Sequence, residues 1–439
     1  MKRKKRKIPL RILGGFALAL AVFLLYNAVF FDVLAKVSFS RAYTDREGKL
    51  LNIFLTDDDK YRLRTRLGDF PPALVEAVLL QEDRYFYGHI GINPWAMLRS
   101  GWETYIKKTR RMGASTITMQ LARLRWGLYT RNIPGKITQS FCALFLEICL
   151  TKQEILEAYL NVAPLGGNIE GYGAASWYYF NKDPKELTKG EIFTLAVIPQ
   201  NPSRRAPIRQ NDADNSRSIV ISAELTAARL TLYGSWLTAH PEDAILRPEM
   251  DMPPHLVNRF PRDAIHLTEY LNIVRREGSS VTTTIDRRMQ GVLERELGAY
   301  VVRNRRWGIR NGSLLLLDWT SMEVLAAIGS ANYSDDEIQG QVNGFASKRS
   351  PGSTLKPFVY ALALEQGIIH PEKMLRDSPR GFSEYTPDNY QGDFKGPVKA
   401  WFALVDSRNI PAVELAGSIR NPDLHEFLVN AGVVGLKER

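Results

Sequence analysis

The sequence contains very little cysteine. Only Cys142 and Cys149 occur among 439 residues, seven positions apart in an apolar segment that we expect to be helical. With a rise of about 1.5 Å per residue, the two would lie about 10 Å apart, beyond the reach of a disulfide. A disulfide framework is therefore excluded, and hydrophobic cores must hold the fold together. Both thiols are expected to be buried apolar side chains.

The net positive charge is small beyond the N-terminus. The formal net charge is +11, and seven of these charges lie in a short basic arm: Lys2, Arg3, Lys4, Lys5, Arg6, Lys7 and Arg11. The remainder of the chain carries a charge of only about +4. We therefore expect no nucleic-acid partner.

Clusters of metal-ligating residues are also missing. An acidic triplet, Asp57, Asp58 and Asp59, has no second group of ligands beside it. We interpret it as a charged turn within a segment of strands from Val37 to Leu67, and we predict no metal site.

One long apolar run follows the basic arm. Residues 12–31 are interrupted only by Tyr26 and Asn27, which is long enough for a transmembrane helix. The basic arm, residues 1–11, predicts a cytoplasmic N-terminus, so the chain after Asp32 should lie on the outer side. No clear cleavage site follows the run, so we favour an uncleaved single-pass anchor over a signal peptide.

The length predicts more than one domain. Apolar residues at helical spacing predict an almost wholly helical region from Pro71 to Ile198. Residues 208–278 lack strong motifs and are interpreted as a connector, with a helix expected from Ser216 to Leu237. Beyond them we expect a strand at 281–286, a helix from Arg287 to Val302, and a hairpin formed by residues 313–319 and 323–328. The fold class therefore changes from α to α/β.

Aromatic and basic residues alternate between Trp95 and Arg111. Such a segment suits a helix at the headgroup boundary of a membrane, or an amphipathic helix packed on a core. The two interpretations have equal support from the sequence.

The segment QEDRYFYGHIGINPW, residues 81–95, carries a candidate catalytic carboxylate. Glu82 is followed by Asp83, and Tyr85, Phe86 and Tyr87 can lower the local dielectric constant and tune a carboxyl pKa for proton transfer. An acidic pair at a helix end is more often a solvated face, so this segment alone does not identify an enzyme.

Two further motifs follow in order: GASTITMQLAR at 113–123 and KQEILEAYLN at 152–161. Together the three resemble the peptidoglycan glycosyltransferase domain of bifunctional, class A penicillin-binding proteins (glycosyltransferase family 51), from about Pro71 to Pro207. The run Ala163–Gly167 is similar to the 1C type. The resemblance implies a mainly α-helical, lysozyme-like domain at residues 37–207.

The resemblance also implies a reaction. Glu82 would deprotonate the acceptor sugar hydroxyl, which attacks the anomeric carbon of a lipid-linked glycan and expels polyprenyl pyrophosphate. An anionic leaving group needs cations, and Arg84, Arg123 and Lys136 match that role. The polar positions of the second motif are Ser115, Thr116 and Gln120; the serine and threonine would alternatively only cap a helix.

The sequence departs from the family at Gln139. The family has a glutamate three residues after the lysine that corresponds to Lys136, whereas Gln139 can orient a substrate but cannot act as a base. We therefore predict that Glu82 is the single essential carboxylate. A divalent cation, Mg²⁺ or Mn²⁺, at the pyrophosphate suits the chemistry, but no ligand set for it is visible.

A second chemical motif begins at Ser353, which with Lys356 fits the S-x-x-K pattern of serine acyl transferases. On a helix these two residues share a face, so the amine can reach the hydroxyl. Ser407 and Asn409 then fit the S-x-N element, and the pair resembles a penicillin-binding transpeptidase domain, assigned to 279–439. The resemblance implies that Ser353 attacks a D-alanyl-D-alanine stem peptide.

The family's third transpeptidase element, K-T-G, does not occur after Asn409. We therefore expect an incomplete domain in which a labelled β-lactam fails to acylate Ser353, whereas a complete chain would react. The combined prediction is a periplasmic or extracytoplasmic glycosyltransferase anchored in the cytoplasmic (inner) membrane. Its partners would be the lipid-linked precursor, nascent glycan and stem peptide. The alternative is a non-catalytic scaffold that holds precursors for a partner synthase; a glycoside hydrolase is less favoured, because Glu82 and Asp83 are adjacent and cannot flank one bond.

Overall fold

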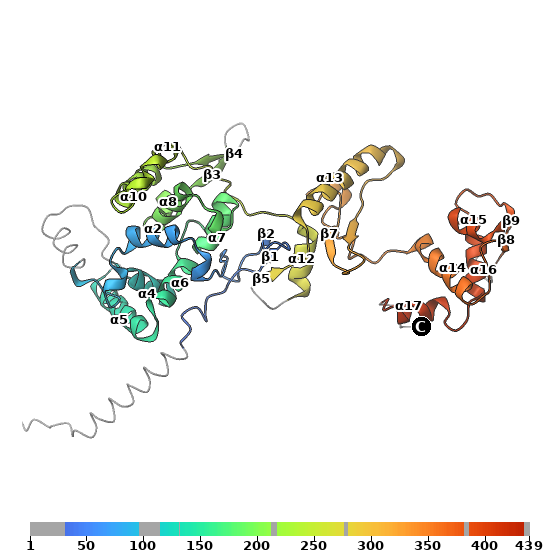
Figure 1. Cartoon of the computed structure of the whole chain (residues 1–439), viewed down its shortest axis with the longest axis horizontal. Helices are drawn as coiled ribbons and strands as arrows, with labels where there is room; N and C mark the ends of the chain where they lie inside the picture. The colour runs from blue at the N-terminus through green and yellow to red at the C-terminus, as the bar shows by residue number, and fades with distance from the viewer. Residues whose placement is uncertain are drawn as a thin grey trace, which may run out of the picture. The chain divides into compact units, whose positions relative to one another are not determined.

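The computed structural model describes residues 31–95, 115–130, 132–211, 217–275, 280–381 and 386–433. The chain divides into two compact units, Met1–Ala346 and Ser347–Arg439, which we call the first unit and the second unit (Figure 1). Separate clusters of buried hydrophobic residues lie in each unit. Each unit is therefore described by itself.

The first unit is built mainly of α-helices (Figure 1). Its helices are α2 (Pro72–Glu82), α4 (Ile117–Trp126), α5 (Ile133–Cys149), α6 (Lys152–Val162), α7 (Tyr172–Phe180), α8 (Lys189–Val197), α9 (Pro202–Arg205), α10 (Ala223–Trp236), α11 (Arg247–Asp251), α12 (Ile265–Val274) and α13 (Arg287–Asn304). Several begin at a residue whose side chain accepts a hydrogen bond from the first turn: Thr116, Asn132, Thr151, Thr188 and Ser222. Each such cap satisfies a backbone N–H that the helix leaves unpaired, and is worth about 1 kcal/mol.

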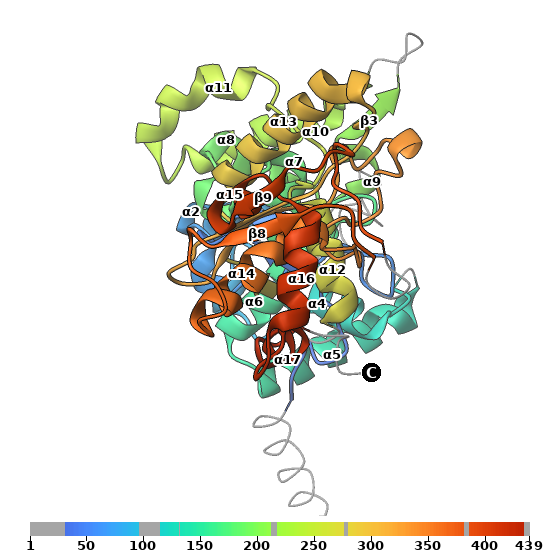
Figure 2. The same ribbon diagram turned by 90° about the vertical axis from the view of Figure 1, so that its right-hand side faces the viewer.

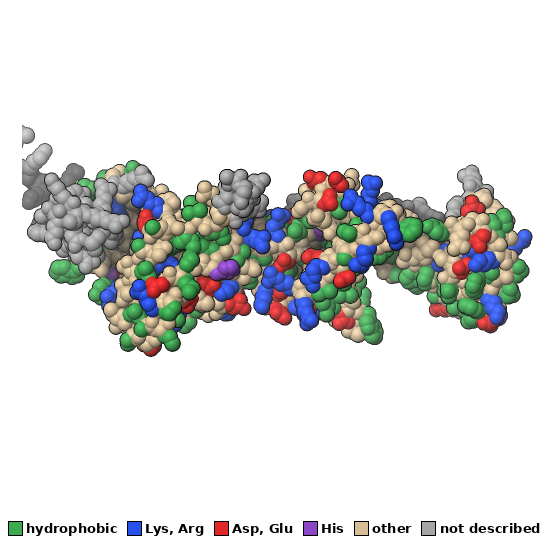
Figure 3. Space-filling view, turned by 90° about the horizontal axis from the view of Figure 1, so that it is seen from above, with side chains coloured by type: hydrophobic (Ala, Val, Ile, Leu, Met, Phe, Trp, Pro, Cys, Tyr) green, Lys and Arg blue, Asp and Glu red, His purple; other side chains and the backbone are tan. Residues whose placement is uncertain are grey.

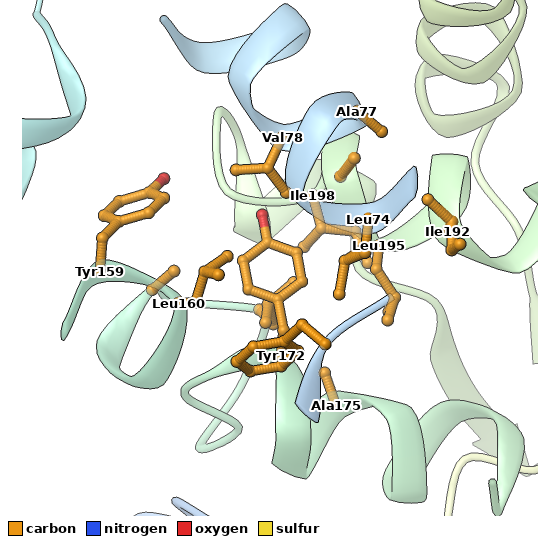
Figure 4. Close-up of a cluster of buried hydrophobic side chains, with 14 of the residues drawn as sticks. Leu74, Ala77, Val78, Tyr159, Leu160, Tyr172, Ala175, Ile192, Leu195 and Ile198 are labelled. Atoms are coloured by element: carbon orange, nitrogen blue, oxygen red, sulfur yellow. The ribbon is translucent and has the colours of Figure 1, made fainter. Parts of the chain in front are cut away.

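The main core of the first unit lies where α2, α6, α7 and α8 meet. Leu74 and Val78, one turn apart on α2, converge with Tyr172 of α7 and Leu195 of α8, and all four are fully buried (Figure 4). Truncating a buried leucine such as Leu74 to alanine costs about 2–5 kcal/mol. This packing fixes α2, whose last residue is Glu82.

Short strands complete the first unit. Strand β1 (Ala42–Thr44) pairs antiparallel with β2 (Leu50–Ile53) and parallel with β5 (Ser280–Thr282). Two further antiparallel pairs are β3 (Ile208–Asn211) with β4 (Arg217–Val220), and β6 (Leu314–Leu317) with β7 (Val324–Ile328). Helix α13 packs against β7, where Gln290 accepts a 2.8 Å hydrogen bond from the Ala327 N–H.

The second unit combines helices with one strand pair (Figure 2). Its elements are the 3₁₀ helix η8 (Gly352–Leu355), α14 (Lys356–Glu365), β8 (Met374–Asp377), β9 (Gly396–Lys399), α15 (Ala400–Val405), α16 (Asn409–Ser418) and α17 (Leu424–Asn430). Strands β8 and β9 are antiparallel, and α14 packs on α16. Leu362, Ala403 and Leu415 are buried in the core between these elements.

Much of the predicted secondary structure is confirmed. The α-helical region, the later change to α/β, the strand near 281, helix α13 and the β6–β7 hairpin all occur where the sequence indicated. The helix expected from Ser216 begins at Ala223, because Arg217–Val220 instead form β4 against β3. That helix, α10, is not a loose connection: its Leu232 and Trp236 are buried in the main core.

Both free cysteines lie on α5, as the spacing predicted, with Cys149 buried. The predicted membrane span at 12–31 lies outside the described residues except for Phe31, and most of the segment from Trp95 to Arg111 also lies outside them. Within the described ranges, no helix combines the length and the apolar character that crossing a bilayer requires. On the face seen in Figure 3, basic and acidic side chains are interspersed.

Candidate active sites

Glu82 ends α2 with its carboxyl group enclosed by protein. Gln120 of α4 donates a 2.8 Å hydrogen bond to Glu82 Oε2, whereas Oε1 is buried without a hydrogen-bond partner among the described residues. Tyr159 donates a weak 3.4 Å bond to Gln120 Oε1, which leaves the Gln120 amide N–H to face Glu82. Burial raises the pKa of Glu82 to about 7, against the lowering effects of Gln120 and of nearby Arg205 and Arg123.

The residues that bury Glu82 differ from those expected. Tyr85 and Tyr87, predicted to lower the dielectric constant, are 68% and 61% exposed, so that part of the prediction was wrong. Two fully buried tyrosines from α6 and α7, Tyr159 and Tyr172, replace them. Burial, and after it the charge of Glu82, raises their pKa well above the usual value. Side chains nearly eighty residues or more away therefore form the apolar surroundings.

Asp83 follows Glu82 in the sequence, but its hydrogen bonds give it a structural role. Its carboxylate lies 3.0 and 3.1 Å from Nε2 of His89 and accepts a 3.0 Å bond from the Ile117 N–H at the start of α4. Since His89 Nδ1 accepts from the Gly91 N–H, Nε2 is the nitrogen that donates to Asp83. The second carboxylate of the pair thus holds the loop after α2 against α4.

Cations face the same region from α4 and α5. Lys136 Nζ donates to Ser115 Oγ at 2.8 Å and to Gln139 Oε1 at 3.1 Å. Burial, together with the charge of Arg123, lowers the pKa of Lys136. Arg123 is half-buried and makes no hydrogen bond or ion pair with the described residues. Positive charge is thus held here without a matching carboxylate.

Gln139 is fully buried beneath this lysine. Its Nε2 donates a 2.7 Å hydrogen bond to the Met119 carbonyl, while its Oε1 accepts from Lys136. The amide satisfies both neighbours at once, which a carboxylate could not do. Gln139 therefore orients Lys136, and it is connected through Met119 to the helix that carries Gln120.

Two residues near Glu82 were not predicted. Gln200 donates a 3.0 Å bond to the carbonyl of Gln81, and Arg205 donates to the side chain of Gln200 at 3.2 Å. The charge of Arg205 also lowers the pKa of Glu82. Both lie more than one hundred residues beyond the first motif, in a segment without a recognisable pattern.

The second unit brings three predicted residues together. Lys356, buried at the start of α14, donates from Nζ to the carbonyl oxygen of Ser407, to Ser407 Oγ at 3.0 Å and to Asn409 Oδ1 at 2.5 Å. Burial lowers the pKa of Lys356, and the neighbouring Arg408 lowers it further. Ser353 lies on η8, exposed, and the Lys356 backbone N–H donates to its carbonyl oxygen. The Lys356 amine makes no hydrogen bond to the Ser353 hydroxyl and is held by the three other oxygens.

A buried ion pair holds the loop that carries Ser407 and Asn409. Arg408 donates to the fully buried Asp377 with a 2.6 Å contact, and to Asp393 at 2.8 Å. Asn389 donates to Asp377 and accepts from the Asn409 N–H, both at 2.8 Å. Ser407 is fixed in the left-handed region, at φ 51°. A cavity of about 370 Å³ opens beside this loop, lined by residues including Ser353, Tyr390 and Ser407.

Comparison with known proteins finds matches in two regions of the chain. Residues 47–226 match the family described as Transglycosylase, and residues 312–433 match the Penicillin binding protein transpeptidase domain. The chain is 36% identical to penicillin-binding protein 1C of Escherichia coli, over 92% of the chain and 52% of that protein. It is 30% identical to penicillin-binding protein 1B of Vibrio cholerae, over 89% and 52% of the two. The chain belongs to the class A penicillin-binding proteins.

Other matches are consistent with this class. Penicillin-binding protein 1F of Bacillus subtilis is 28% identical over 94% of the chain and 58% of its own length. A crystal structure of penicillin-binding protein 1A from Haemophilus influenzae aligns with a TM-score of 0.39 and 18% identity, covering 91% of this chain and 64% of that one. The chain spans about half the length of the curated relatives it matches.

In this class A penicillin-binding protein, the predicted residues fall into groups. One hydrogen bond joins Gln120 to Glu82, and two others join Lys136 to Ser115 and to Gln139. The charge of Arg123 lowers the pKa of both Glu82 and Lys136, so these six residues form one region. Thr116 caps α4 and donates to the Gly91 carbonyl, so the capping interpretation of this residue is confirmed. Arg84 is exposed and makes no hydrogen bond or ion pair with the described residues.

Proposed function

We propose that the first unit is a peptidoglycan glycosyltransferase, which polymerises lipid-linked disaccharide-peptide into glycan strands and releases polyprenyl pyrophosphate. The observation that carries the proposal is the carboxyl of Glu82, whose pKa burial raises to about 7 and whose Oε1 has no hydrogen-bond partner in the described part of the chain. A general base works best when its pKa lies near the working pH. Cations without carboxylate partners, Arg123 and Lys136, lie in the same region.

The proposed step moves one proton and exchanges one bond. Glu82 accepts the proton of the acceptor sugar hydroxyl as the hydroxyl oxygen forms a bond to the anomeric carbon of the lipid-linked glycan. The bond from that carbon to the pyrophosphate oxygen breaks, and the leaving group keeps the electron pair. Arg123 and Lys136 stabilise its charge, since ionised donors bind phosphate oxygens strongly. Gln139 keeps Lys136 in place through their 3.1 Å bond.

The scaffold alternative is not favoured. Leaving a carboxyl oxygen buried and unpaired has a free-energy cost that a pure binding site has no reason to bear. Such a cost is common at active sites, where perturbed pKa values serve the reaction. The alternative would keep precursor binding but show no turnover.

A protein-held divalent cation fits these residues poorly. Both oxygens of Asp83 are occupied by His89 and the Ile117 N–H, so Glu82 Oε1 is the one open carboxylate oxygen in the described part of this region. Mg²⁺ needs several oxygen ligands in an octahedron. We therefore assign no step to a metal ion.

For the second unit, we propose a serine D-alanyl-D-alanine transpeptidase site whose K-T-G element does not occur after Asn409, so we expect no acylation of Ser353 by a β-lactam in this chain. Lys356 and Ser407 are placed to exchange a proton, because Nζ and Oγ are 3.0 Å apart and burial lowers the pKa of the lysine. Ser353 would be the nucleophile, and Asn409 would hold the substrate amide. Acylation of Ser353 requires Lys356 to release at least one of its present oxygen partners.

We further propose that the protein is anchored in the cytoplasmic membrane by one span, with its N-terminus in the cytoplasm and both units outside. The support is the basic arm and the apolar run of the sequence. An apolar stripe at helical spacing on α5 is consistent with contact to lipid, since Ile133, Ile137, Phe141 and Ile148 are all more than half exposed.

The test is polymerisation of fluorescent lipid-linked disaccharide-pentapeptide by the purified chain in detergent. We expect product from the unaltered chain and from Arg303→Gln, an exposed arginine on α13 that serves as control, and none from Glu82→Gln. Precursor binding is measured in parallel. Tight binding by the unaltered chain without any polymer would refute the proposal and support the scaffold.

Gln139→Glu separates the remaining alternatives. If one carboxylate suffices, this variant is no faster than the unaltered chain. Polymer formed only after Gln139→Glu would show that a second carboxylate is required, and that the natural chain is a binding protein.

A further inference from the structure

A cavity of the first unit is lined in part by residues of α4. Its volume is about 460 Å³, within the usual range for small-molecule sites. The apolar part of its lining comes from the segment after the predicted span and from α4 and α6: Val33, Leu34, Val37, Leu121, Leu124 and Val162. Phe31, at the start of this segment, stacks on Trp126 with the ring centroids 6.4 Å apart. This contact connects the segment to the end of α4.

The polar part of the lining contains one cation that is paired with carboxylates and two that are not. Arg62 is neutralised, because it donates to Asp58 and to Glu170, both at 2.7 Å. Lys36 and Arg125 also line the cavity, and neither makes an ion pair or hydrogen bond with the described residues. Lys36 and Arg125 are thus two cations without a partner among the described residues, at a cavity that the carboxylates of Asp58 and Glu170 also line.

Arg125 is the most informative of these residues. Its Nε atom is buried without a hydrogen-bond partner among the described residues. Leaving a buried N–H of a charged group unpaired is unfavourable, so the retention of this arginine calls for an acceptor. The electrostatically favourable position in the last turn of α4 stabilises the charge but supplies no acceptor for Nε.

The position on the helix separates this arginine from the catalytic region. Successive residues of an α-helix are rotated by about 100°, so Arg123 and Arg125 point about 200° apart. Arg123 faces the Glu82 region, whereas Arg125 shares the other face with Leu121, one turn earlier. Nothing in the proposed reaction uses Arg125.

We propose that this cavity binds one anionic glycerophospholipid. Its phosphate would accept hydrogen bonds from Arg125 and Lys36, and one acyl chain would lie against the valine and leucine side chains. A planar guanidinium suits phosphate oxygens, and a lysine adds charge at the rim. The predicted span ends at residue 31, two residues before Val33, which would place the cavity at the headgroup level of the bilayer, where such lipids are found.

The experiment uses the full chain purified in detergent, with retained lipid counted by native mass spectrometry. The probes are dioleoyl phosphatidylglycerol, dioleoyl phosphatidylcholine with the same acyl chains, a polyprenyl phosphate and inorganic phosphate. The variants are Arg125→Gln, Arg125→Lys and Lys36→Gln, and Arg303→Gln removes the same charge elsewhere. Lys36 is exposed, so its substitution tests the site even where a change at Arg125 disturbs folding.

We expect one retained phosphatidylglycerol, held at least about tenfold more tightly than phosphatidylcholine, with this preference lost in Arg125→Gln and weakened in Lys36→Gln. Arg125→Lys should fall between, and Arg303→Gln should match the unaltered chain. Equal retention of the two phospholipids, or unchanged preference in both glutamine variants, would overturn the proposal. So would stronger retention of polyprenyl phosphate, or complete competition by inorganic phosphate. Because the readout is lipid retention, this result is independent of polymerisation.

Discussion

Removing the charge of Glu82 should stabilise the first unit, by an amount that grows as the pH rises from about 4.5 to about 7. The folded-state pKa of this carboxyl is about 7, against 4.5 for an unperturbed glutamate. Below pH 4.5 the group is protonated in both the folded and the unfolded state and has no effect. As the pH rises from 4.5 to 7, the unfolded chain loses this proton while the folded chain keeps it, so stability falls.

The size of the effect follows from the same two pKa values. The full difference corresponds to about 3 kcal/mol, because each factor of ten in proton affinity is worth about 1.4 kcal/mol. Glu82→Gln cannot ionise and keeps an oxygen that can accept from Gln120. Its stability advantage over the unaltered chain should therefore be about 2–3 kcal/mol larger at pH 8 than at pH 5.

Scanning calorimetry of the full chain can measure this, provided the transition of the first unit is followed separately. For a unit of 346 residues each kcal/mol moves the midpoint by roughly 1–2 °C. Glu186→Gln, an exposed glutamate without a partner among the described residues, is the control and should show no such pH dependence. A Glu82→Gln advantage of equal size at pH 5 and pH 8 would refute the argument that burial raises this pKa. Polymerisation by the unaltered chain should rise with pH through about 7, as the base ionises.

Three further predictions concern other contacts. Arg123→Gln should slow polymerisation about 10- to 100-fold, because one charge facing the leaving group is lost; steady-state rates with fluorescent precursor measure this. Gln139→Glu should destabilise the first unit by about 1–3 kcal/mol, since a carboxylate cannot donate to the Met119 carbonyl; denaturant unfolding measures it. Arg408→Ala should destabilise the second unit by about 3–5 kcal/mol, because the buried charge of Asp377 loses its cationic partner and keeps only the hydrogen bonds from Asn389 and the Lys395 N–H; hydrogen exchange in β8 should rise accordingly.

Each of these predictions has an outcome that contradicts it. Arg123→Gln and Arg303→Gln with the same rate would show that charge at position 123 is not used. Unchanged unfolding of Gln139→Glu at neutral pH would mean that the buried amide can be replaced without loss. Equal exchange in Arg408→Ala and in the exposed control Arg376→Ala would contradict the role of the buried pair.

The sequence predicted which candidate residues come together better than it predicted their surroundings. Spacing alone identified the S-x-x-K helix start, and the structure places Lys356 on Ser407 and Asn409, fifty residues away. The sequence could not predict that the Lys356 amine would make no hydrogen bond to the Ser353 hydroxyl. The amine is bonded instead to oxygens of Ser407 and Asn409, which lie on a loop distant in sequence. Local patterns carry no information about which distant oxygens approach an amine.

The same limit explains the error at Glu82. Tyr85 and Tyr87 were expected to bury it because they are near in sequence, but they point to solvent. The real surroundings come from Tyr159 and Tyr172 on other helices, where they look like ordinary core residues. Helical periodicity does predict that they are buried, but not which charge they are buried against.

The pairing of β1 with β5 has a consequence for how the chain is synthesised. Residues 42–44 emerge early but acquire their parallel neighbour only when residues 280–282 have followed. Until then one edge of β1 has free backbone N–H and C=O groups, which other chains can pair with. A shortened chain that stops at residue 226, where the Transglycosylase match ends, would keep that edge open permanently. Such a fragment should therefore associate with itself more readily than one that extends past Thr282.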